Sequence, residues 1–145
     1  VLRPPGDDRH WWIMADVEGG DFCAFVRDSR PSLPGRLYEL VVDCADAHAQ
    51  ADWWAGVLGV ERERESQEHF AALEGGDLLP FDYVCFVQVP EPKRVKNRIH
   101  WDVMAPDLPA LLALGARLLR EPHAEISWHV MADPEGNEFC AFPAT

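Results

Sequence analysis

Apolar and polar positions along the chain predict two series of short elements in the same order. In the first series, helical spacing after Asp46 predicts a helix that ends at Gly59. Apolar runs predict the accompanying strands at 37–43, 61–65, 69–74 and 83–89. In the second series, a helix from Asp107 to Gly115 accompanies predicted strands at 98–104, 117–120, 126–132 and 138–142. Each half is therefore predicted to run strand–helix–strand–strand–strand, and residues 90–97 join the halves.

The first predicted helix carries a stripe of apolar side chains. Near helical spacing, the stripe consists of Ala49, Trp53, Val57 and Leu58. We expect this stripe to face the core. Most of the six tryptophans are expected there too, and Trp54 is our candidate for lining a cleft and stacking on a flat ligand.

The beginning of the chain repeats its end. Residues 10–25 and 127–142 share ten of sixteen positions when one is moved by 117 residues. The first copy predicts a hairpin, with strands at 11–15 and 22–26, and a proline-rich linker follows at 27–36. This segment, 1–36, has three interpretations: the tail of an upstream domain, an extension of the domain's own sheet, or an element that pairs with a partner chain. Its large aromatic side chains favour an ordered hairpin that packs on the sheets of residues 37–142, within one chain or across a dimer.

Composition and charge restrict the function classes. The chain has 145 residues, 48% of them hydrophobic and 26% charged, which is typical of one globular domain. The net charge of −12 argues against nucleic acid and anionic membrane surfaces as partners, and no apolar run is long enough to span a membrane. Four cysteines without a C-x-x-C pair are typical of reduced thiols, so we expect a cytoplasmic protein.

Four stretches between residues 37 and 142 carry a family resemblance. They are Leu40–Asp46 with Trp53–Gly59, Val89–Lys93, Lys96–Val103 and Asp133–Cys140. In this order they resemble bacterial glyoxalase-like domains of the vicinal oxygen chelate superfamily, which includes glyoxalase I, bleomycin-resistance proteins, fosfomycin-resistance transferases and extradiol dioxygenases. The resemblance implies an α+β fold of two βαβββ modules, 37–89 and 98–142, whose curved sheets enclose a cleft.

The resemblance also implies a metal site on the first and fourth strands of each module. At these positions the sequence has Glu39, no strong ligand near Gln88, then His100 and Cys140. Glu39 and His100 are our metal-ligand candidates. Because the set is incomplete, we expect no cofactor, and a divalent metal (Zn, Ni, Mn or Fe) remains the alternative.

The same strands supply the candidates for ligand binding. His100 has a second interpretation, as a histidine held by Asp102 on the same strand face. A carboxylate such as Glu39 on an apolar strand needs a cation or water, which indicates a polar pocket. The substrate-binding candidates are Glu39, Trp54, Gln88, His100, Asp102 and Cys140.

Two functional hypotheses follow. The first is a homodimeric protein that binds a small organic molecule in its cleft without full metal chemistry, as bleomycin-resistance proteins do. The second is a metal-dependent lyase or dioxygenase. The sequence assigns no catalytic residue, so it does not decide whether the protein is an enzyme.

Overall fold

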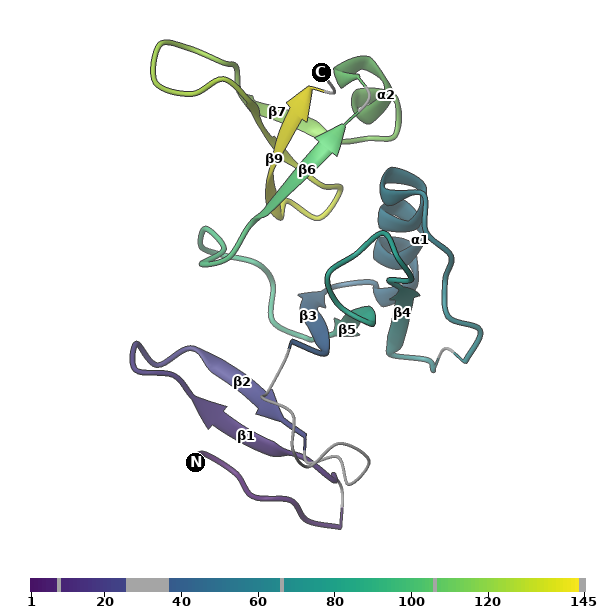
Figure 1. Ribbon diagram of the computed structural model, residues 1–145, viewed down its shortest axis with the longest axis vertical. Coiled ribbons are helices and arrows are strands. Elements are labelled where there is room, and N and C mark those ends of the chain that lie inside the picture. The colour runs from purple at the N-terminus through teal and green to yellow at the C-terminus, as the bar shows by residue number, and fades with distance from the viewer. Residues whose placement is uncertain (8, 26–36, 66, 106, 144–145) are drawn as a thin grey trace. The chain divides into compact units, whose positions relative to one another are not determined.

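The computed structural model describes residues 1–7, 9–25, 37–65, 67–105 and 107–143, and it divides into two units, 1–36 and 37–145. In the first unit, strands β1 (Trp12–Ala15) and β2 (Asp21–Ala24) form the predicted antiparallel hairpin (Figure 1). Arg3 pairs with Ile13 on the other edge of β1. The predicted linker lies outside the described residues. The two sheets of the second unit consist of its own strands.

The first sheet of the second unit has the order β3-β5-β4. Its strands are β3 (Glu39–Cys44), β4 (Phe70–Glu74) and β5 (Tyr83–Gln88), and β3 runs parallel to β5. The strand predicted at 61–65 is reduced to a single bridge, Arg62 to Leu73. Helix α1 (Ala47–Leu58) follows β3, as the predicted module requires.

The second sheet has the order β6-β9-β8-β7. Its strands are β6 (Trp101–Ala105), β7 (Arg117–Arg120), β8 (His129–Ala132) and β9 (Glu138–Pro143). Helix α2 (Leu108–Ala113) connects β6 to β7, and β6 runs parallel to β9 (Figure 1). Each first strand thus pairs with the last strand of its own module. The α+β fold with two βαβββ modules is therefore confirmed.

The buried face of α1 differs from the predicted stripe. The buried side chains are Ala47, Gln50, Ala51 and Trp54, whereas Ala49 is exposed and Trp53, Val57 and Leu58 are half-buried. The prediction is borne out for Trp53, Val57 and Leu58, which pack against the core, and it fails for Ala49. In the structure Trp54 fits between the modules, beside Trp101 and Phe139. The core is continuous across both sheets.

None of the described helices is long and apolar enough to cross a membrane. The two helices contain 12 and 6 residues, whereas a membrane span needs about 20. The longer helix begins where Asp46 accepts a hydrogen bond from the Ala49 amide, and it ends at Gly59, which has φ 67°. Both ends match the prediction.

Candidate functional site

The turn between β8 and β9 is organised by one buried carboxylate. Oδ1 of Asp133 accepts hydrogen bonds from the amides of Glu135 and Asn137, at 3.0 and 2.9 Å. Its Oδ2 accepts from the Asn137 side chain at 3.0 Å and from the Trp54 indole at 3.3 Å. Gly136 completes the turn with φ 93°. Asp133 is fully buried, and these four donors explain how the fold tolerates it.

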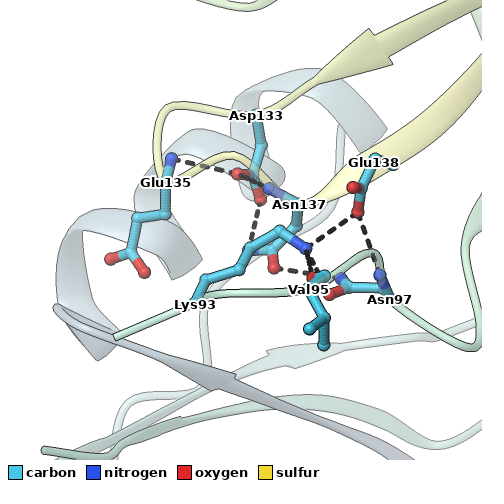
Figure 2. A network of polar contacts seen from close by, with 7 residues as sticks. All are labelled: Lys93, Val95, Asn97, Asp133, Glu135, Asn137 and Glu138. Carbon is cyan, nitrogen blue, oxygen red and sulfur yellow. Dashed lines mark hydrogen bonds and ion pairs between the residues drawn. The ribbon is translucent and has the colours of Figure 1, made fainter. Parts of the chain in front are cut away.

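Lys93 ties the segment between the modules to the start of β9 (Figure 2). Its Nζ donates to Asn97 Oδ1 at 2.7 Å and forms an ion pair with Glu138 at 2.9 Å. Burial alone would raise the pKa of Glu138. The hydrogen bonds from Lys93 and from the Asn97 amide outweigh burial, so the pKa lies below its usual value. The side chain of Asn97 also donates to Asn137 at 3.0 Å.

Contacts from the turn also reach α1 of the first module. The carboxylate of Glu135 accepts hydrogen bonds from the amides of Ala45 and Asp46, at 2.7 and 2.8 Å. A negative charge at this end of the helix is favourable because it interacts with the helix dipole. Together with the Trp54 indole, these bonds join the two modules. This polar network therefore fixes α1 and the segment between the modules to the turn between β8 and β9.

Three possible ligand atoms converge on the second sheet. One atom each from His100, Asp102 and Cys140 lies within 4.8 Å of the others. Asp102 on β6 is directly opposite Cys140 on β9, which follows from the parallel register of these strands. His100 directly precedes β6 and shares the period-two face with Asp102. His100 and Asp102 are exposed, whereas Cys140 is buried.

The surroundings of Cys140 raise the pKa of its thiol and so favour the protonated form. Burial raises its pKa first, and a hydrogen bond to Asp102 and the charge of that carboxylate add to the effect. A hydrogen bond from Trp128 and the positive charge of Lys96 act in the opposite direction and are weaker. Without a metal, Cys140 therefore serves as a hydrogen-bond donor rather than as a nucleophile.

Apolar side chains lie on the same face as these polar groups. Trp128 stacks on Phe142, with ring centroids 5.2 Å apart and an interplanar angle of 28°. Met104, opposite Phe142 in the strand register, is 67% exposed. We call this side of the second sheet the open face; it carries His100, Asp102, Met104, Trp128, Cys140 and Phe142. It offers hydrogen-bonding groups beside an accessible apolar surface.

The structure separates the remaining candidates from this group. Glu39 lies on β3, where its Oε2 is 3.5 Å from Cys85 Sγ, and it is not part of the His100 group. Trp54 is 2% exposed, and its indole bonds to Asp133. Gln88 is at the far end of β5 from Glu39 and bonds to His69 at 3.1 Å. The candidates therefore divide into one cluster on the second sheet and three separate positions.

Sequence reasoning did not select Trp128, Phe142 or Met104 for the site. A signal was present, because the repeat at the start of the chain keeps Trp and Phe at the corresponding positions, Trp11 and Phe25. These two rings are also close, with centroids 5.6 Å apart. Identity within the repeat was therefore a signal that could have selected Trp128 and Phe142, whereas Met104 lies outside the repeat.

The sequence of residues 39–142 matches the model of the glyoxalase-like domain family. The chain belongs to this family. The match covers the strands and both helices of the second unit except the last residue of β9, and it confirms the predicted resemblance to the vicinal oxygen chelate superfamily. A search of curated proteins found no match.

Solved structures from the same superfamily share the fold. One is a glyoxalase/bleomycin resistance protein/dioxygenase family enzyme from Burkholderia phytofirmans, with 20% identity, TM-score 0.57 and coverage of 74% of this chain and 97% of that one. A possible glyoxalase from Bacillus cereus has 14% identity, TM-score 0.57 and the same coverage. The fosfomycin resistance protein FosX from Mesorhizobium loti has 16% identity, TM-score 0.54 and coverage of 78% and 94%. At these identities the likeness shows the fold alone.

Proposed function

We propose that the open face of the second sheet binds a small, partly aromatic organic molecule, and that the protein acts by binding without full metal chemistry. The observation that supports this is the position of the Trp128–Phe142 pair beside His100, Asp102 and Cys140. A flat ring stacks on the aromatic pair, while a polar substituent bonds to the trio. The net charge of −12 and the fold suit a cytoplasmic binding protein.

Binding at this face can be tested with an aromatic acid as the probe. We expect 2-naphthoic acid, titrated into the ¹⁵N-labelled chain, to shift amide resonances mainly at 100–104, 128–130 and 140–142. Replacing Trp128 by Ala should weaken binding about tenfold, because one stacking surface is lost. Leu112→Ala is the control, since Leu112 is a partly exposed residue of α2. Shifts confined to other surfaces, or equal affinity in the Trp128 variant, would contradict the proposal.

A second candidate function is metal-dependent lyase or dioxygenase chemistry. The convergence of His100, Asp102 and Cys140 favours it. One nitrogen, one oxygen and one sulfur ligand suit zinc better than the harder ions Mg²⁺ or Mn²⁺, because a thiolate is a soft ligand. A bound ion would polarise a substrate oxygen, with His100 and Asp102 holding it from the exposed side and Cys140 from the sheet.

Metal analysis decides between the two candidates. Under the binding proposal, the chain dialysed against zinc should keep well under one zinc ion when measured by inductively coupled plasma mass spectrometry. One zinc ion per chain that is lost in both His100→Ala and Cys140→Ser would favour the enzyme. Cys85→Ser is the control, because this buried thiol lies beside Glu39 and outside the trio. Glu39→Ala tests whether that carboxylate contributes as well.

We further propose that the protein works as a homodimer. The apolar side chains that remain exposed outside the open face, such as Val41 on β3 and Leu119 on β7, support an assembly that covers them. Light scattering on the full chain after size-exclusion chromatography should give twice the chain mass. A monomeric mass over the whole concentration range would contradict this part of the proposal.

A further inference from the structure

Every described pairing of the first unit has a counterpart among the last three strands of the second module. With the shift of 117 residues, the bridge between Arg3 and Ile13 corresponds to the pair Arg120–Val130. The bridge between Gly6 and Arg9 corresponds to that between His123 and Ile126. All four pairs of β1 with β2 correspond to the four pairs of β8 with β9. The repeat therefore begins ahead of residues 10–25. Three earlier residues, Leu2, Arg3 and Pro5, are identical to their counterparts Leu119, Arg120 and Pro122.

The hydrogen bonds from the turn's backbone amides to the aspartate are copied as well. Oδ1 of Asp16 accepts hydrogen bonds from the amides of Glu18 and Gly20, as Asp133 does from Glu135 and Asn137. Gly19 has φ 84°, close to the 93° of Gly136. The first unit is thus the β7–β8–β9 part of a module, without a counterpart of β6 and α2 among the described residues.

The two copies differ in what covers them. In the second module, β6 pairs with the outer edge of β9, and Phe139 is 1% exposed. In the first unit, no described strand pairs with the outer edge of β2, and Phe22, the counterpart of Phe139, is 48% exposed. Cys23 is exposed, whereas its counterpart Cys140 is buried. The side chains that normally face a core are retained, while the surface they form is accessible.

We propose that the outer edge of β2 and the Phe22 face bind a strand–helix unit of the kind formed by residues 98–117. The second module shows its geometry: β6 runs parallel to β9, and Leu111 of the helix that follows β6 is buried in one cluster with Met131 and Phe139. We expect the bound strand to run parallel to β2 and its helix to join Met14 and Phe22 in the same way. We place the unit in the same polypeptide, because the two copies are repeats of one sequence within this chain. The shift of 117 residues exceeds one module and corresponds to one whole two-module domain with its linker. The first unit is therefore the closing part of a preceding glyoxalase-like domain in a tandem protein.

A fusion of two segments of this chain tests the proposal. Residues 98–117, which contain no cysteine, are placed directly ahead of Val1 in the full chain, so that the register of the second module is reproduced. In the unfused chain, Cys23 should be the one thiol that reacts rapidly with Ellman's reagent, since the other three are buried. In the fusion, we expect its reaction rate to fall at least about tenfold, because the thiol becomes buried as Cys140 is. Hydrogen exchange at the β2 amides should slow in parallel, because a parallel strand now pairs with them.

Control proteins distinguish the strand–helix unit from a second copy of the chain as the partner of this surface. The same prefix with Val103→Asp and Leu111→Asp introduces charges at positions that are buried in the second module, so Cys23 should stay reactive. A prefix with the native sequence that leaves both Cys23 reactivity and β2 exchange unchanged would overturn the proposal. Slower Cys23 reaction in the unfused chain at rising protein concentration would also overturn it, because a second copy would then cover this surface.

Discussion

At the residue scale, hydrogen-bond partners decide what a buried polar side chain costs the fold. Asp133 accepts hydrogen bonds from four donors, and these bonds make the burial of its carboxylate tolerable. Gln50 on α1 is 2% exposed, and neither its Nε2 nor its Oε1 has a hydrogen-bond partner among the described residues. An amide buried without partners costs about 1–3 kcal/mol. These two residues therefore act on stability in opposite directions.

Gln50→Met should accordingly stabilise the protein. The substitution keeps the length of the side chain and removes the buried amide, so we expect the free energy of unfolding to rise by about 1 kcal/mol, within the range for such groups. Urea unfolding followed by circular dichroism measures the change. Gln88→Met is the matched control, since Gln88 is exposed and should change stability by less than about 0.5 kcal/mol. A loss of stability in the Gln50 variant would mean that its amide has a partner in solution.

At the element scale, the segment between the modules is fixed to β9 by the Lys93–Glu138 pair. Both side chains are less than one-third exposed, at 25% and 17%. The pKa of Glu138 is lowered in the folded state. Its contribution to stability is therefore fully present above the unfolded-state pKa of about 4.3 and is lost as the pH falls through the folded-state pKa.

Glu138→Gln should lower the free energy of unfolding at neutral pH, and this difference from the native protein should become smaller as the solution becomes acidic. At pH 7 we expect the variant to be less stable, because the ion pair and its charged hydrogen bonds are weakened. As the pH falls through the lowered folded-state pKa of Glu138, the two proteins should converge, since this carboxylate becomes protonated in both states. Urea midpoints at pH 7, 5, 4 and 3 give the comparison, with exposed Glu121→Gln as the control. A difference that stays constant over this range would show that Lys93 does not lower the pKa of Glu138.

Elements with clear end signals were predictable from the sequence, and those without them were not. Asp46 and Gly59 defined α1 to the residue, because a capping carboxylate and a glycine with positive φ act locally. The strand predicted at 61–65 failed, since a charged segment with little apolar alternation pairs only at Arg62. On the second sheet, period-two alternation correctly placed His100 and Asp102 together, and the family resemblance added Cys140.

At the scale of the whole molecule, the deciding contacts join residues far apart in the sequence. The Trp54 indole bonds to Asp133, and Trp53 bonds to the Leu114 carbonyl at 2.7 Å. Neither spacing nor periodicity reveals such a pair, so Trp54 was interpreted as a ligand-stacking residue when the structure places it in the core. The same limit applies to Glu39. The family resemblance suggested it as a metal ligand beside His100, but whether the two residues meet depends on tertiary contacts, and the structure places Glu39 outside the His100 group. Local sequence patterns predicted the two modules, whereas the way the modules pack together depends on tertiary contacts that these patterns do not reveal.

Trp54 should therefore hold both modules in one cooperative unit. Its ring lies 4.2 Å from that of Trp101 and 5.2 Å from that of Phe139, both on the second sheet. Trp54→Ala should lower the free energy of unfolding by about 3–5 kcal/mol, because it leaves a large cavity and removes a donor to Asp133. Trp54→Phe, which keeps an aromatic ring but loses the indole N–H and part of the ring volume, should cost clearly less.

Hydrogen exchange under native conditions shows whether this loss is shared. Amides of β5 report on the first module and amides of β9 on the second. In a cooperative unit, Trp54→Ala accelerates the most protected amides of both strands to the same extent, because they exchange through one global opening. If β5 loses protection while β9 keeps that of the native protein, the modules unfold independently, and the buried indole then stabilises only the first module.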